Sequence, residues 1–126
     1  MKRTLLGLSI LLCSTLGLAA AEPAPQLPRL VDLGADKCIP CKLMAPIIAE
    51  LTKDYAGQLN VVFVDVWKNP GQGKAYNIQV IPTQIFYDES GKERFRHEGF
   101  MAKKDILAKW KEIGVELNST PPAKKS

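Results

Sequence analysis

Apolar residues in this chain form short continuous runs that are separated by a long stretch of helical period. The runs at residues 30–33, 61–66 and 84–87 are mostly apolar, which is typical of buried β-strands. After the first run, apolar residues recur every three or four positions, which predicts an amphipathic helix with Leu43, Met44, Ile47, Ile48, Leu51 and Tyr55 on one face. A strand, a helix and a second strand in this order predict a right-handed parallel crossover.

Turn-forming residues and a second helical pattern follow these elements. Residues 88–91 (Asp-Glu-Ser-Gly) predict a hairpin loop that leads to a strand at 94–98, after a short amphipathic stretch around residues 75–76. A last helix is expected at about 103–113, with Ile106, Leu107, Trp110 and Ile113 on one side. The chain has no internal repeat, so we expect one domain with a single core.

The first 21 residues have a different pattern. Lys2 and Arg3 precede an apolar run at residues 4–18 and a small-residue triplet at 19–21, which is typical of a secretory signal peptide cleaved after Ala21. An uncleaved membrane anchor is the alternative, but a span needs about 20 apolar residues, and this run is shorter. We expect a periplasmic or otherwise exported protein without a stable membrane anchor.

Composition and charge narrow the functional classes. The 126 residues are 46% hydrophobic and 24% charged, as in an ordinary globular domain. The formal net charge of +4 includes Lys2 and Arg3, and the remainder is too weak to indicate nucleic-acid binding. We expect a Pro-rich tether at 22–29, a folded domain at 30–116 and a flexible tail at 117–126, in a protein that is a monomer.

Two cysteines remain after the signal segment, and they have C-x-x-C spacing. A structural disulfide stabilises most when it closes a long loop, whereas Cys38 and Cys41 close almost none. A redox role or a metal site is therefore favoured. A metal-binding or copper-delivery module is the less favoured of the two, because one pair offers two thiolate ligands and His97 is distant in sequence. We expect no bound metal and no cofactor.

The position of the pair at the start of a helix separates the roles of the two cysteines. Cys38 faces unpaired backbone N–H groups and the positive end of the helix dipole, which favour thiolate over thiol, and Lys37 adds a cation. Cys38 is therefore the expected nucleophile. Cys41 lies one turn further on and inward, where it is placed to resolve a mixed disulfide. Pro40 suits the opening turn, and Pro46 is expected to kink the helix.

These residues and their spacing resemble the thioredoxin family over residues 30–115. The segment from Cys38 to Pro46 is similar to the family's active-site helix, and Ile81-Pro82-Thr83 resembles its cis-proline loop. Asp32, six residues before Cys38, matches a buried carboxylate that takes a proton from the second cysteine through water. Since Asp32 lies inside an apolar run, we expect burial and a raised pKa. The resemblance implies catalytic roles for Cys38, Cys41 and Asp32, and substrate contacts for Lys37, Ile39, Pro40, Ile81, Pro82 and Gly99.

Departures from the family pattern also carry expectations. Lys37 replaces the tryptophan that usually precedes the first cysteine, and Phe63 stands where a lysine often pairs with the buried aspartate. After cleavage at Ala21 only ten residues would precede Asp32, too few for the family's extra N-terminal strand and helix. We therefore expect a minimal thioredoxin-like α/β fold: a four-stranded mixed sheet of order 2-1-3-4 with helices on both faces. Trp67 and Trp110 are expected in core or rim packing, and His97 in a structural or surface position.

The function expected from this resemblance is thiol-disulfide oxidoreduction outside the cytoplasm. Neither residue between the cysteines is histidine, and Pro40 before the second cysteine is similar to the reducing members, whereas Lys37 favours the opposite direction by stabilising the thiolate. A reductase is expected, with an oxidant or isomerase as the alternative. The implied partners are disulfide-containing exported proteins, with apocytochrome c during cytochrome c maturation as one candidate, and a membrane thiol-transporting electron donor.

Overall fold

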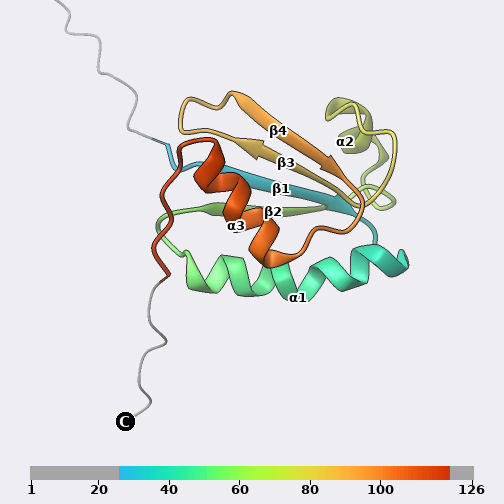
Figure 1. The fold of residues 1–126 in the computed structure, drawn as a ribbon. Helices are drawn as coiled ribbons and strands as arrows, with labels where there is room; N and C mark the ends of the chain where they lie inside the picture. The colour runs from blue at the N-terminus through green and yellow to red at the C-terminus, as the bar shows by residue number, and fades with distance from the viewer. Residues whose placement is uncertain (1–25, 120–126) are drawn as a thin grey trace, which may run out of the picture.

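The three apolar runs and the strand after the hairpin form one four-stranded sheet in the computed structural model, which describes residues 26–119 (Figure 1). The sheet contains β1 (Arg29–Gly34), β2 (Asn60–Asp65), β3 (Thr83–Tyr87) and β4 (Glu93–Glu98) in the order β2-β1-β3-β4. β1 is parallel to β2 and antiparallel to β3, and β3 is antiparallel to β4. This mixed sheet confirms the expected strand order.

Helices cover both faces of the sheet, as expected. α1 (Ile39–Asp54) and α3 (Lys103–Glu112) lie on one face, and α2 (Pro70–Ala75) lies toward the other (Figure 1). Because side chains alternate along a strand, Leu30 of β1 packs with α1 and α3, whereas Val31 and Leu33 pack on the opposite face. The fold therefore rests on two apolar layers. Each fully buried Leu or Phe in them contributes roughly 1.5–3 kcal/mol to the stability of the folded state.

The buried face of α1 differs from the predicted one at a single position. Met44, Ile48, Leu51 and Tyr55 are buried, but Leu43 is 57% exposed, so its predicted burial is wrong. Adjacent helical residues point about 100° apart, and the face centred on Met44 turns Leu43 toward solvent. α1 continues without interruption past Pro46.

The second apolar run was expected to be a buried strand, and this expectation is wrong for much of β2. Val61, Val62 and Val64 are half-buried, and Phe63 is 45% exposed. The cause is the strand order, because β2 lies at an edge of the described sheet and has a strand neighbour on one side only.

The C-terminal helix joins the other elements through side chains of both kinds. Ile106 and Trp110 are fully buried, and Leu107 and Ile113 pack against the same core, as predicted. Lys103 Nζ lies 2.7 Å from Asp54 Oδ2 and 2.9 Å from Glu50 Oε2, both on α1. These two carboxylates raise the pKa of Lys103 to about 12, so α3 is fixed to α1 by charge as well as by apolar packing.

Packing continues past residue 116, where a flexible tail was expected to begin. Leu117 packs against the core of the α1 and α3 face. Asn118 exchanges two hydrogen bonds with the side chain of Gln58, at 2.7 and 2.9 Å. The predicted signal peptide, the first half of the predicted tether and most of the predicted tail lie outside the described residues. Within residues 26–119, no helix has the length and apolarity needed to cross a membrane.

Candidate active site

The strand pairings bring several loops to one edge of the sheet. β1 and β2 end there, at the paired residues Gly34 and Asp65. β3 begins there, because Thr83 pairs with Leu33 of β1, and β4 ends beside it at Glu98. The segments that carry Cys38, Trp67, Pro82 and Gly99 therefore gather at this edge, although up to 61 residues separate them in sequence.

Cys38 and Cys41 form a disulfide at the start of α1, with their Cα atoms 5.2 Å apart. Cys38 is the N-cap, and its Sγ accepts a hydrogen bond from Cys41 N at 3.4 Å. The two sulfurs differ in access, since Cys41 is buried at 4% exposure and Cys38 is half-buried. In the reduced protein, the same backbone donor and the helix dipole stabilise a Cys38 thiolate. The geometry thus suits Cys38 for attack on a partner and Cys41 for attack on Cys38.

The loop before β3 contains a cis peptide bond between Ile81 and Pro82, the isomer that the resemblance implied. Gly99 N donates to Pro82 O at 2.7 Å, so Gly99 and the proline loop lie side by side. Gly99 has φ +97°, a conformation that favours glycine. Pro82 is buried, and Ile81 and Gly99 are half-buried.

Asp32 is buried under the disulfide end of α1, as its apolar neighbours predicted. Its exposure is 1%, and burial raises its pKa to about 6, while a hydrogen bond from the Gln84 side chain opposes part of this rise. Gly34 lies two residues after Asp32 on the same face of β1, and its contacts show how close this face comes to Cys41. A Cβ placed on Gly34 would lie 3.2 Å from Cys41 Sγ, so Cys41 sits over β1 about one pleat from the carboxyl group.

Gln84 is a site residue that the sequence reasoning missed. Its Nε2 donates to Asp32 Oδ1 at 2.9 Å, and its side chain is fully buried. The available signal was a polar residue in phase with Phe86, a core residue of the same predicted strand. Phe63 on β2 is paired with Asp32 in the strand register, and its phenyl ring supplies no charge to the carboxyl group.

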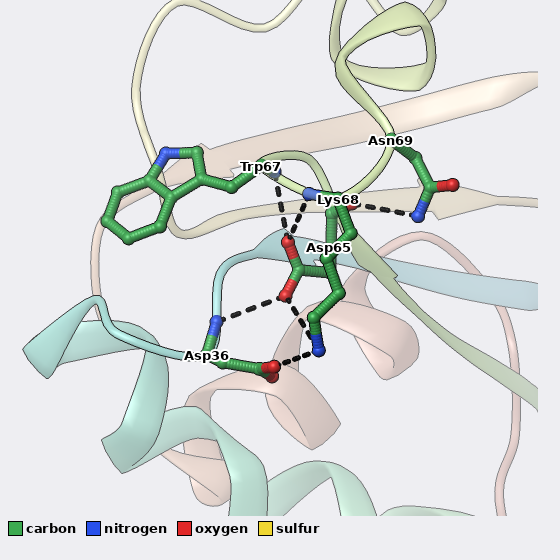
Figure 2. Close-up of polar contacts among 5 residues, drawn as sticks. All are labelled: Asp36, Asp65, Trp67, Lys68 and Asn69. Atoms are coloured by element: carbon green, nitrogen blue, oxygen red, sulfur yellow. Dashed lines mark hydrogen bonds and ion pairs between the residues drawn. The ribbon is translucent and has the colours of Figure 1, made fainter.

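Asp65 connects the two loops that flank the disulfide. Figure 2 shows its carboxylate accepting from three backbone N–H groups, those of Asp36 at 3.2 Å and of Trp67 and Lys68 at 3.0 Å each. These hydrogen bonds lower the pKa of Asp65, the largest effect coming from Lys68 N. Lys68 Nζ also pairs with the Asp36 carboxylate (Figure 2). The loop that carries Lys37 and Cys38 is thus fixed to the loop after β2.

Trp67 does not pack in the core or at its rim, so that prediction is wrong for this residue. Its side chain is 60% exposed, and the indole ring points away from the Asp65 cluster (Figure 2). Its backbone N–H donates to Asp65 at the end of β2, and Trp67 belongs to neither apolar cluster of the core. Trp67 and Ile81 line a hollow of about 350 Å³. Trp110 is fully buried, as predicted.

The remaining predicted contact residues lie around the disulfide at the surface. Ile39 is 74% exposed, and Lys37 and Pro40 are also exposed. Val80 and Phe100, which flank the proline loop and Gly99, are each 46% exposed. His97 is half-buried on β4, with Nε2 3.1 Å from Phe100 O. The surface beside Cys38 is therefore apolar with a nearby cation.

A hollow of about 340 Å³ lies beside the buried cysteine and is lined by Cys41, Ala45 and Phe63. Another hollow, about 590 Å³, is lined by Leu27, Arg29 and Tyr87 at the opposite end of the sheet from the disulfide. Among residues 26–119, no three His, Cys, Asp or Glu side chains gather as a metal site.

The comparison with known families agrees with this geometry. The family model for thioredoxin matches residues 22–112, most of the chain. The chain belongs to the thioredoxin family. As a thioredoxin-like redox protein, it carries its disulfide-forming pair at Cys38 and Cys41, where the structure shows the disulfide.

Thioredoxins from plants and bacteria are among the similar proteins. The M-type chloroplast thioredoxin of Spinacia oleracea is 44% identical over 62 residues, which cover 49% of this chain and 34% of that protein. The thioredoxin of Rickettsia conorii is 35% identical over 82 residues, or 65% of this chain and 77% of the relative. The thioredoxin of Staphylococcus aureus is 36% identical over 78 residues, with 62% and 74% covered.

Two solved structures share the fold. Chloroplastic thioredoxin z superposes with a TM-score of 0.64 at 30% identity, covering 70% of this chain and 79% of the other. A malarial protein superposes with a TM-score of 0.65 at 21% identity, covering 69% and 97%, which is a likeness of fold alone.

Proposed function

We propose that this thioredoxin-like protein reduces disulfide bonds of other proteins outside the cytoplasm. The observation that supports this most is the difference in access between the two sulfurs. Cys38 is the half-buried N-cap of α1, and Cys41 is buried beneath it. A partner disulfide reaches Cys38 alone, and the bond formed there lies within reach of Cys41.

The chemistry then follows in two exchanges. The Cys38 thiolate attacks one sulfur of a client disulfide, which forms a mixed disulfide and releases the client's other sulfur as a thiolate. Cys41, after giving its proton to the Asp32 carboxylate, attacks Cys38 and releases the second client sulfur. The client gains two electrons and two protons, and Cys38 and Cys41 become the disulfide that the structure holds.

The neighbouring surface supports an extended protein client. Exposed Ile39, Val80 and Phe100 supply apolar contact area around the disulfide. A client strand would pair with the backbone of Ile81, next to Pro82, and Gly99 beside this loop has no side chain to obstruct it. Lys37 adds a positive charge at the same edge.

The direction and the location are inferred from the sequence. Ile39 and Pro40 between the cysteines, without a histidine, favour reduction, and several similar proteins are named thioredoxin. The signal-like segment at residues 1–21 supports export. A reductase in an oxidising compartment has to be re-reduced, so we expect a membrane thiol-transporting donor, and apocytochrome c is a candidate client.

The deciding measurement is the reduction potential of the Cys38/Cys41 couple in residues 22–126, equilibrated against defined thiol buffers. A value near or below about −250 mV supports a reductase, whereas a value near −120 to −180 mV would identify an oxidant or isomerase.

Two variants test the division of labour between the cysteines. Cys38→Ser should abolish insulin reduction. Cys41→Ser should accumulate a mixed disulfide with the client, visible as a mass increase that a reductant removes. A Cys38→Ser protein that still reduces insulin would contradict the mechanism.

A further inference from the structure

One row of side chains crosses the whole sheet on the face covered by α1 and α3. The strand registers place Phe63, Asp32, Gln84 and His97 side by side, one on each strand. Leu30 and Phe86 are two residues from Asp32 and Gln84, respectively, so they lie on the same face of the sheet. Both belong to the core under α1 and α3, so the row faces these helices. The catalytic carboxyl group is therefore flanked by a phenyl ring and an amide.

The amide of Gln84 is the side-chain partner of Asp32. Gln84 Nε2 lies 2.9 Å from Asp32 Oδ1, and both side chains are at most 1% exposed. None of the ion pairs formed within residues 26–119 includes Asp32. The carboxyl group is consequently oriented by a neutral group.

Each partner has one further buried oxygen. Asp32 Oδ2 and Gln84 Oε1 are both buried and have no hydrogen-bond partner within the described part of the chain. An amide offers a donor and an acceptor on the same group, whereas a lysine offers donors only. A carboxylate accepts from the amide nitrogen, and a protonated carboxyl group can donate to the amide oxygen after rotation of the amide. Gln84 can therefore bond Asp32 in either protonation state.

We infer that Gln84 is the positioning residue of the Asp32 carboxyl group through its whole proton cycle. This rests on the proposed function, because the cycle belongs to the resolution step. The Asp32 carboxylate takes the Cys41 proton, Cys41 Sγ bonds to Cys38 Sγ, and the bond from Cys38 to the client sulfur breaks. The client thiolate is then protonated from solvent, and Asp32 returns its proton to solvent. Gln84 donates to Asp32 before the transfer and accepts from it afterwards.

Other titratable groups facing Asp32 are few. Cys41 comes from α1, and His97 lies beyond Gln84 on β4. Asp65 lies two residues after Phe63 on β2, with its Oδ2 3.8 Å from Lys68 Nζ. The parts of α3 buried against this face are the apolar Ile106 and Trp110. The raised pKa of Asp32, with the Gln84 hydrogen bond opposing the rise, is consistent with this arrangement.

The first test removes the amide without changing the length of the side chain. Reduced Gln84→Met protein is mixed with the aromatic disulfide DTNB, and the second release of coloured thiol, which reports attack by Cys41, is followed over a range of pH. The acid limb of the profile is the low-pH range in which release slows because Asp32 is protonated. Loss of the Gln84 hydrogen bond, which favours the carboxylate, should move this limb to higher pH by about one unit, which is a tenfold slower release at a given pH on the limb. Ile85→Val is the matched control: it alters a buried residue of the same strand on the opposite face, and its acid limb should stay in place.

The outcome that overturns the inference is a Gln84→Met protein whose acid limb coincides with that of the unchanged chain. DTNB reports the dithiol chemistry whatever the client is, so failure to reduce protein disulfides would refute the proposed function alone. If Gln84→Met does not fold, the unchanged chain decides by NMR. The Gln84 side-chain amide signals should titrate with the same apparent pKa as the Asp32 carboxyl carbon, and amide signals insensitive to that titration would overturn the inference.

Discussion

At the scale of single residues, the site depends on one carboxyl group that is costly to ionise. Asp32 is 1% exposed beside Phe63 and held by Gln84, and none of the ion pairs among residues 26–119 includes it, so burial disfavours its charged form. A buried charge without a paired cation lowers stability. In the proposed mechanism this cost is offset by function, because the carboxyl group lies one pleat from Cys41 and takes up its proton.

The cost of this carboxyl group predicts a stability that depends on pH. The pKa of Asp32 rises from 3.8 to about 6 on folding, so the folded chain binds this proton more tightly than the unfolded chain. The contribution of Asp32 to the free energy of unfolding therefore falls as the pH rises from about 4 to 6, by roughly 3 kcal/mol in total. Asp32→Asn keeps an oxygen for Gln84 and removes the charge. The oxidised variant should resist urea better at pH 8 and equal the unchanged chain at pH 4. An advantage of the same size at both pH values would contradict the assignment.

The exposed side chain of Trp67 leads to a second prediction, on how tightly the proposed protein client binds. An exposed indole beside Ile81 offers a large contact area, and aromatic residues often dominate such interfaces. Trp67→Ala should lower kcat/KM for insulin reduction by roughly tenfold, about 1.4 kcal/mol, and leave the reaction with DTNB unchanged. Leu27→Ala is the control, because Leu27 is 44% exposed at the opposite end of the sheet. Equal losses in both variants would exclude a specific contact.

At the scale of elements, the site exists because three segments approach closely at the end of β1. A Cβ on Gly34 would lie 3.1 Å from Cys41 Cβ on α1 and 3.2 Å from Phe63 Cε2 on β2. Asp65 fixes the adjoining loop through three backbone hydrogen bonds. The position of the disulfide over the sheet is therefore set by backbone contacts as much as by side chains.

This close approach predicts the effect of a single methyl group. Gly34→Ala should force α1 or Phe63 to shift and lower the free energy of unfolding by about 1–3 kcal/mol. Gly71→Ala is the matched control, because no atom lies within 4 Å of its added Cβ in the first turn of α2. That control should leave stability unchanged or raise it by up to about 1 kcal/mol. Urea unfolding of the oxidised proteins measures both, and a fully stable Gly34→Ala protein would show that this contact is not tight.

The connection between the two loops predicts a contrast between two charged residues. Asp65→Ala leaves three backbone N–H groups without their acceptor, so it should lower the unfolding temperature and speed hydrogen exchange at the Asp36 amide. Lys68→Met removes an exposed ion pair with Asp36 and should change both quantities little. If Lys68→Met has the larger effect, the ion pair and not the backbone hydrogen bonds holds the loop.

At the scale of the whole molecule, the fold is closed at the end away from the disulfide by its last described residues. Leu117 covers the core of the α1 and α3 face, and Asn118 joins the turn after α1 through Gln58. The chain therefore folds as one unit in which the C-terminal segment completes the core, and the loops at the other end carry the chemistry.

This arrangement predicts where the chain can be shortened. Ending the chain after Glu116 removes the Leu117 packing and both hydrogen bonds to Gln58, and should lower the free energy of unfolding by about 1–2 kcal/mol. A chain ending after Ser119 keeps these contacts and should be as stable as the full one. Chemical unfolding of the two shortened proteins makes the comparison, and equal stability would mean that Leu117 and Asn118 contribute nothing.

The sequence by itself determined the strands and the helices, because these depend on local periodicity and on turn residues, whereas the expected order of the sheet came from the family resemblance. It also identified Cys38 and Cys41 by their spacing at a helix start, and the family resemblance pointed to Asp32 and Pro82. The α/β architecture followed from those elements with the family resemblance. Burial was predictable where a residue lay centrally in a periodic pattern, as with Trp110.

Only the tertiary structure decided which residues surround these groups. Gln84 lies 52 positions from Asp32 and meets it through the antiparallel register of β1 and β3. Phe63 became exposed because its strand lies at an edge, and Trp67 lies exposed after β2, outside both apolar clusters of the core. Strand register and hydrogen bonds between distant segments arise only when the chain is folded. Local sequence therefore specifies the reactive groups, and the three-dimensional packing specifies what tunes them.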